Sequence, residues 1–87
     1  MKILKNAVAG TMESSDVYVQ IEPGTDGIQL QLESVVAQQF GESIQHVVRE
    51  VLQEQGVENA NVRVVDRGAL ECVIRARVET AILRGKE

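Results

Sequence analysis

Apolar and polar residues alternate along the first third of the chain, and this two-residue period predicts strands. One alternating run covers residues 16–22, and a second begins at residue 28 after the turn-forming segment 23–27. The apolar faces of the two runs consist of Val17, Val19, Ile21, Ile28, Leu30 and Leu32. Because only a short glycine-rich loop separates the runs, we expect them to form an antiparallel hairpin. The opening segment Ala7–Met12 could add a third strand.

The spacing of apolar residues then changes to three or four, which predicts an amphipathic helix. Its apolar stripe consists of Val36, Phe40, Ile44, Val47, Val48, Val51 and Leu52. Ser34 is a suitable N-cap for this helix, and Gly56 is a suitable stop. Val62 and Val64, with Ala60 before them, indicate a further strand.

A second helix is predicted after the segment Asp66-Arg67-Gly68, capped by Asp66 or by a neighbouring backbone group, and it ends at Gly85. Its apolar side is Leu70, Val73, Ile74, Val78, Ala81 and Ile82. The order β-β-β-α-β-α predicts an α+β fold, in which two helices cover one face of a small, largely antiparallel sheet. We expect residues 1–87 to form a single domain.

Composition excludes several classes of function. With 13 acidic and 9 basic residues the net charge is −4, which disfavours binding to nucleic acid. Tyr18 and Phe40 are the only aromatic residues, so the chain lacks stacking platforms for bases. No apolar run is long enough for a membrane helix. A single cysteine and the absence of a signal-like start lead us to expect a cytoplasmic protein.

The residues that most often carry catalysis are isolated in this sequence. His46 has no second histidine or cysteine cluster with which to form a metal site, so we interpret it as a solvated helix residue. Cys72 lies in an apolar helical pattern and is expected to be a buried structural thiol. Since no acid–base pair is apparent, a stand-alone enzyme is poorly supported.

Two adjacent hydroxyls, Ser14 and Ser15, lie in a polar turn between Glu13 and Asp16. A serine that another enzyme modifies must project into solvent, and a short turn between strands gives that access. Ordinary turn composition would explain the same residues. Gly68 is expected to supply backbone freedom at the start of the second helix, where the helix N-terminus would bind an anion or simply be capped.

The basic residues of the second helix are Arg75, Arg77 and Arg84. Near its C-terminal end they suit the helix dipole. They would equally suit an acidic partner surface.

Three segments together resemble the acyl carrier (gamma) subunit family of citrate lyase. They are Ala-Val-Ala-Gly-Thr-Met-Glu-Ser-Ser-Asp at 7–16, Glu-Ser-Val-Val-Ala-Gln-Gln-Phe-Gly at 33–41, and Val-Asp-Arg-Gly-Ala-Leu-Glu-Cys-Val-Ile-Arg-Ala-Arg at 65–77. The resemblance extends from Ala7 to about Arg84. Ser14 matches the serine that carries the family's prosthetic group. Ser15 stands where members often have glycine, and it is the fallback site.

Two other serines faintly echo the Asp-Ser-Leu site of ordinary phosphopantetheine carriers, namely Ser34 and Ser43. Those carriers are four-helix bundles. The alternating strands before Ser34 contradict such a fold, so we interpret Ser34 as an N-cap and Ser43 as a helix-surface residue.

The resemblance implies a non-catalytic carrier subunit that acts in citrate fermentation. Ser14 would be joined through a phosphodiester to 2'-(5''-phosphoribosyl)-3'-dephospho-CoA, whose thiol would hold acetyl and citryl groups while citrate is cleaved to acetate and oxaloacetate. The implied partners are the alpha (acyl transferase) and beta (citryl lyase) subunits, the holo-carrier synthase transferase and the acetate-activating ligase. No nucleic acid, metal or membrane partner is implied.

Two alternatives stay open. The first is the acyl carrier subunit of malonate decarboxylase, which uses a similar arm. The second is a small α+β protein-interaction domain with no covalent group, which would leave Ser14 unmodified.

Overall fold

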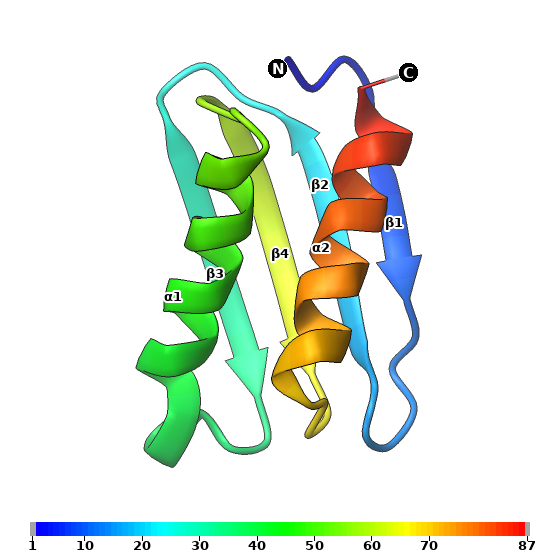
Figure 1. Ribbon diagram of the computed structural model, residues 1–87, viewed down its shortest axis with the longest axis vertical. Coiled ribbons are helices and arrows are strands. Elements are labelled where there is room, and N and C mark those ends of the chain that lie inside the picture. The colour runs from blue at the N-terminus through cyan, green and yellow to red at the C-terminus, as the bar shows by residue number, and fades with distance from the viewer. Residues whose placement is uncertain (1, 87) are drawn as a thin grey trace.

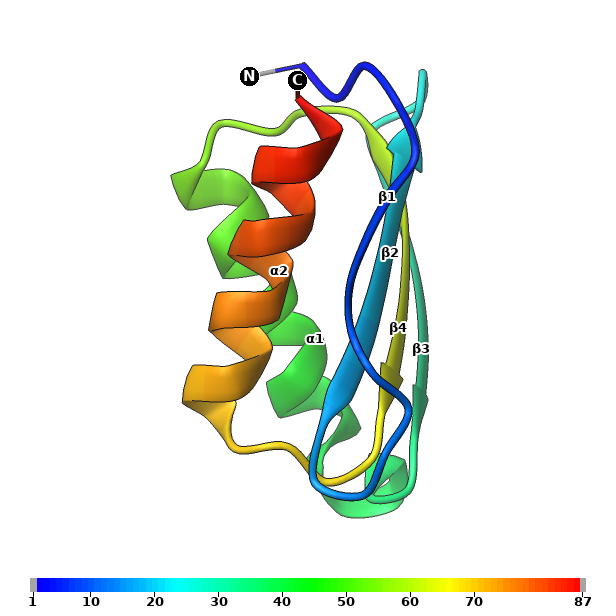
Figure 2. The ribbon, with the colours of Figure 1, turned by 90° about the vertical axis from the view of Figure 1, so that its right-hand side faces the viewer.

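The computed structural model describes residues 2–86 and contains four strands and two helices in the predicted order. These elements are β1 (Ala7–Gly10), β2 (Val17–Pro23), β3 (Ile28–Ser34), α1 (Ala37–Glu54), β4 (Ala60–Asp66) and α2 (Glu71–Gly85). Both helices pack on the same face of the sheet, which gives two layers (Figures 1 and 2). The predicted α+β fold class is confirmed, and the fold is not a helical bundle.

The order of strands in the sheet is β1-β2-β4-β3, so the predicted hairpin between β2 and β3 is wrong. β4 lies between them, antiparallel to β2 and parallel to β3, while β1 pairs antiparallel with β2. The loop from β2 to β3 therefore crosses the start of β4. There the Ala60 amide donates to the Gly27 carbonyl at 3.1 Å, and the Gly27 amide donates to Asn59 Oδ1 at 2.8 Å.

The core lies between the sheet and the two helices. β2 directs Val17, Val19 and Ile21 inward, as the alternation predicts, and each of these side chains is buried. The helices contribute the buried residues Ile44, Val47, Val48, Val51, Leu52, Ile74, Val78, Ala81 and Ile82. Because burial of one such side chain stabilises the fold by roughly 1.5–3 kcal/mol, this layer dominates the stability of a chain this small.

Neither helix begins with a polar cap. The N-caps are Val36 and Leu70, and neither makes a side-chain capping hydrogen bond. Ser34, the predicted N-cap of α1, is instead the last residue of β3. A Ser, Thr, Asp or Asn at each N-cap would typically add about 1 kcal/mol of stability.

Three residues predicted to face the core are exposed instead. Phe40 lies in the first turn of α1 and Leu70 precedes α2, so both lie at the end of the helical layer. The Cys72 thiol is exposed, because it is two residues from the buried Ile74 and so points away from the core. The predicted stop of α1 is confirmed, since the helix ends at Glu54 just before Gly56.

The N-terminal segment is fastened to the end of α2. The Gly85 carbonyl accepts hydrogen bonds from the amides of Leu4 and Lys5, at 2.9 and 3.1 Å. A Cβ atom at Gly85 would lie 3.3 Å from methyl groups of Ile3 and Ile21. The absence of a side chain at Gly85 thus lets the N-terminal segment pack closely against the helix.

Candidate functional site

Three loops meet at one end of the molecule, which we call the serine end. They are the β1–β2 loop (11–16), the β3–α1 loop (35–36) and the β4–α2 loop (67–70). Figures 1 and 2 show them together at the lower end, with both chain termini at the opposite end. The serine end therefore brings the three segments of the family resemblance together in space.

The β1–β2 loop exposes both serines and is fixed through its backbone. The Ser15 amide donates to the Arg67 carbonyl at 2.8 Å, and the Arg67 amide donates to the Asp16 carbonyl at 2.9 Å. Ser15 has a positive φ of 64°. Within the described residues the Ser14 hydroxyl has no hydrogen-bond partner, and it is exposed. The hydroxyl is therefore open to another enzyme, whose own base would activate it.

Asp16 anchors the loop through its side chain. Its carboxylate accepts hydrogen bonds from Thr11 Oγ1 and from the Val17 amide, each at 2.7 Å, and Arg77 Nε lies 3.2 Å away. The bond from Thr11, followed by the bond from the Val17 amide, lowers the pKa of Asp16 from 3.8 to about 2. The carboxylate is therefore ionised at neutral pH and holds the loop against α2.

Gly10 brings β1 into this loop at a position where a side chain does not fit. Its φ is +85°, and a Cβ atom there would lie 1.8 Å from the Val17 carbonyl oxygen. The absence of a side chain at Gly10 therefore allows the close approach of β1 to β2.

Asp66 joins the other two loops, a role that the sequence did not reveal. Its side chain is 1% exposed. One carboxylate oxygen accepts from Ser34 Oγ at 2.8 Å and the other from the Ala69 amide at 2.9 Å, while its carbonyl accepts from the Val35 amide at 3.2 Å. Asp66 thus caps the loop before α2 rather than the helix itself. The predicted backbone freedom at Gly68 is confirmed by its φ of +90°.

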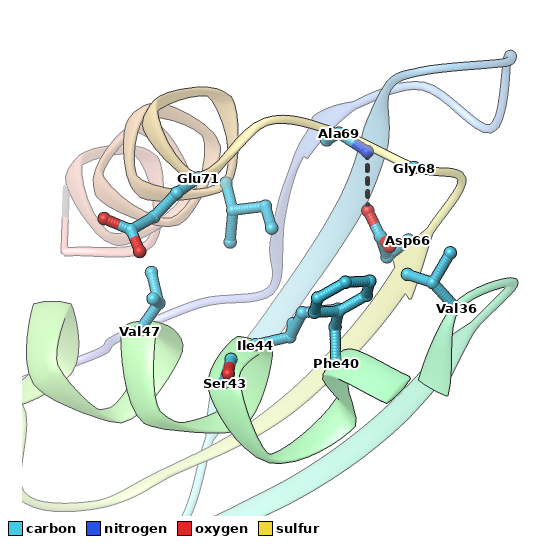
Figure 3. Close-up of a pocket in the computed structure, with 10 residues that line it drawn as sticks. Val36, Phe40, Ser43, Ile44, Val47, Asp66, Gly68, Ala69 and Glu71 are labelled. Atoms are coloured by element: carbon cyan, nitrogen blue, oxygen red, sulfur yellow. Dashed lines mark hydrogen bonds between the residues drawn. The ribbon is translucent and has the colours of Figure 1, made fainter. Parts of the chain in front are cut away.

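A cavity of about 320 Å³ opens between the N-terminal ends of the two helices, beside Asp66. Its lining is mostly apolar and consists of Val36, Phe40, Ser43, Ile44, Val47, Asp66, Gly68, Ala69, Glu71 and Ile74. Figure 3 shows side chains of α1 directed toward the β4–α2 loop, where the Asp66–Ala69 hydrogen bond is drawn. The predicted position of Ser43 on the helix surface is confirmed, and it lies at the edge of this cavity.

The remaining candidates lie elsewhere. His46 is exposed as predicted, with Nε2 3.3 Å from Glu50 Oε2. Arg75 bonds to Glu50, and this hydrogen bond followed by the charge of Arg75 lowers the pKa of Glu50. Arg84 Nη1 donates to the Val8 carbonyl at 2.8 Å. Arg77 binds Asp16, so each of the three arginines of α2 has a partner within the chain.

Across residues 2–86, no three His, Cys, Asp or Glu side chains are grouped so that they could hold a metal ion. Over the same residues, neither helix is both long and apolar enough to cross a membrane.

Known proteins resemble this chain over its whole length. The family model described as "ACP: Malonate decarboxylase delta subunit (MdcD)" matches residues 4–85. Citrate lyase acyl carrier protein 2 of Salmonella typhimurium is 59% identical over 88 residues, a match that covers 100% of this chain and 91% of the relative. The citrate lyase acyl carrier proteins of Klebsiella pneumoniae and Lactiplantibacillus plantarum are 56% and 51% identical, with the same coverage.

A solved structure shares the fold. A chain in the crystal structure of a Pseudomonas malonate decarboxylase hetero-tetramer in complex with malonate superposes with a TM-score of 0.79 at 24% identity, covering 97% of this chain and 91% of that chain. At this identity the likeness establishes the fold alone. The identity to the curated carriers goes further: the chain belongs to the citrate lyase acyl carrier protein (gamma subunit) family, whose members are non-catalytic carrier subunits.

Proposed function

We propose that this carrier holds a 2'-(5''-phosphoribosyl)-3'-dephospho-CoA arm on the Ser14 hydroxyl and serves citrate lyase. The observation that carries the proposal is the state of that hydroxyl: it is exposed, without a hydrogen-bond partner in the described chain, and mounted on a loop that is fixed on both sides. A long polar arm attached there would extend into solvent and displace no buried group. The residues present therefore fit the group.

The geometry of the loop favours Ser14 over Ser15. Position 15 has a φ of 64°, which glycine adopts without strain and serine rarely adopts. A glycine at this position, as relatives often have, would adopt the positive φ without strain. The hydroxyl shared with those relatives is the one at position 14.

When bound, the arm supplies a thiol that holds acyl groups as thioesters. The protein's residues have other tasks. Asp16, Thr11 and Arg77 hold the loop in place, and Asp66 holds the neighbouring loops. A flexible arm on a fixed base lets one thiol reach two active sites at high effective concentration. The proposed partners are the alpha and beta subunits of the lyase.

The test is intact mass and peptide mapping of the chain co-expressed with the holo-carrier synthase transferase and its precursor supply. We expect one adduct of the phosphoribosyl-dephospho-CoA type on Ser14, absent in Ser14→Ala and retained in the matched control Ser15→Gly. An adduct that persists in Ser14→Ala and disappears in Ser15→Gly would move the site to Ser15. No adduct, with the transferase active on a carrier from a relative, would overturn the proposal.

A malonate decarboxylase carrier is the second candidate, favoured by the family model and by the fold of the Pseudomonas chain. Purified subunits separate the two. The acetylated holo-protein should support citrate cleavage with citrate lyase alpha and beta subunits. Malonate decarboxylation with the corresponding decarboxylase subunits, without citrate cleavage, would favour the second candidate.

A further inference from the structure

We propose that four exposed apolar side chains around the serine end form the docking surface for the transferase that attaches the arm, and that the transferase meets them with an apolar face. We call these residues, Met12, Val35, Phe40 and Leu70, the serine-end patch. The inference rests on the proposed function, because it concerns the enzyme that must act on Ser14.

Exposed apolar side chains are concentrated at this end. In the described chain seven large apolar residues are exposed, and four of them belong to the serine-end patch. Met12 is 46% exposed, Phe40 53%, Val35 63% and Leu70 71%. Each lies in or beside one of the three loops that meet there (Figures 1 and 2). Exposed apolar residues that cluster on one part of a protein surface indicate an interaction site.

Hydrogen bonds join the loops that carry Val35 and Leu70 to the loop that carries Ser14. Arg67 binds the β1–β2 loop through two backbone hydrogen bonds, and its neighbour Asp66 binds Val35, Ser34 and Ala69. A partner that docks on Val35, Phe40 or Leu70 therefore meets Ser14 at a fixed position. Such fixed geometry is what an enzyme needs in order to place a protein hydroxyl in its active site.

Stability alone would favour other residues here. Leu70 is an N-cap without a capping hydrogen bond and is also the most exposed large apolar residue described. Asp, Ser or Asn would cap the helix and be solvated at that position. Local rules that a sequence breaks without a structural gain are expected at functional sites.

The cavity beside Phe40 adds a pocket to the serine-end patch. Its lining joins the β4–α2 loop to α1 through Ala69, Phe40 and Ile44 (Figure 3). A flat patch binds weakly, whereas an apolar side chain of a partner inserted in a pocket can dominate an interface. The transferase is expected to place such an anchor here.

The chemistry selects the transferase among the possible partners. In the attachment step the Ser14 oxygen bonds to a phosphorus of a triphosphate-activated precursor, the bond from that phosphorus to pyrophosphate breaks, and a base of the transferase takes the hydroxyl proton. This step occurs at Ser14 itself, so the transferase must cover the serine end. The lyase subunits act at the far end of a long arm and can bind elsewhere.

The experiment compares patch variants with exposed apolar residues outside the serine end. Phe40→Ser and Leu70→Ser test the patch. The matched controls are Leu4→Ser and Leu83→Ser, since these leucines are 61% and 47% exposed and lie outside the patch. The initial rate of adduct formation is measured by mass spectrometry over a range of carrier concentrations. Calorimetry measures the binding of the same variants, in a Ser14→Ala background, to the purified transferase and to the purified alpha and beta subunits. Circular dichroism checks the fold.

We expect the two patch variants to lower kcat/KM about tenfold or more through KM, with a matching loss of affinity, and the controls to stay within about twofold of wild type. Patch variants that are folded and modified like wild type would overturn the inference while leaving Ser14 as the site. Normal transferase binding combined with lost binding to the alpha or beta subunit would overturn the choice of partner. Absence of an adduct on the wild-type chain would overturn the proposed function and this inference together.

Discussion

The two ends of the sheet are held by different kinds of contact. At the serine end, two carboxylates accept many of the hydrogen bonds that hold the loops. Asp66 binds Ser34 and Ala69, and Asp16 binds Thr11 and Arg77. At the opposite end the acceptors are neutral oxygen atoms, including the Val8 carbonyl that accepts from Arg84. Gly85 binds the N-terminal segment through its carbonyl, and the Gly27 loop is bonded to the start of β4.

This difference in contacts matches a difference in role between the end that exposes Ser14 and the end that holds the chain termini. Charged hydrogen bonds fix three loops in position while leaving their tips free of core packing, which suits a loop that must offer a hydroxyl to another enzyme. Close packing at Gly85 mainly contributes stability. Changes at the two ends should therefore differ in kind as well as in size.

The largest effect is expected for Asp66→Ala. The substitution leaves the Ser34 hydroxyl and the Ala69 amide without their partner, so we expect a loss of about 3 kcal/mol in the free energy of unfolding. Urea denaturation measures it. Asp26→Ala, which changes an exposed aspartate at the opposite end, is the control and should be nearly neutral. Equal effects of the two substitutions would remove the special role of Asp66.

Gly85→Val probes the opposite end and should cost about 2 kcal/mol, because the new side chain overlaps Ile3 and Ile21. Glu79→Val places the same residue on the exposed face of α2, where it meets no packed side chain, and should cost much less. We further expect Gly85→Val to leave the initial rate of Ser14 modification unchanged in folded protein. A slowed modification would mean that the two ends are coupled, contrary to the comparison.

The smallest effect is a pH dependence confined to the serine end. Since the pKa of Asp16 falls from 3.8 to about 2 on folding, its contribution to stability is complete above about pH 4 and is lost as the pH falls toward 2. The difference in unfolding free energy between wild type and Asp16→Asn should shrink over that window. Urea denaturation at pH values from 2 to 5 measures it, and a constant difference would exclude the Asp16 carboxylate as the titrating group.

The strands and their inward faces were predictable, but their neighbours were not. Alternation at Val17, Val19 and Ile21 depends only on which face is buried, so the sequence alone predicts the inward face correctly. Pairing depends on the whole chain. The short loop after β2 favoured a hairpin, whereas β4, some 26 residues farther along than the end of β3, occupies the position between the two strands. No residue pattern within β2 or β3 indicates that β4 lies between them.

Side chains near the ends of elements were the least predictable part of the site. Helical spacing placed Phe40 and Leu70 with the core, but each lies where the helical layer ends, so nothing covers it. Ser34 is a residue type that often caps helices, but here it ends β3. Its hydroxyl donates to Asp66, distant in sequence, and accepts from the Val36 amide just before α1. The exposure of Ser14 was predictable because polar turns between strands lie at the surface.

The position of β4 between β2 and β3 has a consequence for how the chain acquires its structure. The strand that completes the sheet is the fifth of six elements along the chain. During synthesis β2 and β3 are made first, and each lacks its central neighbour until residues 60–66 follow. Contacts between segments far apart in sequence slow folding. The sheet can therefore close only after most of the polypeptide has left the ribosome. The inward valines of β2 stay uncovered for longer still, until α2 follows and packs on β2.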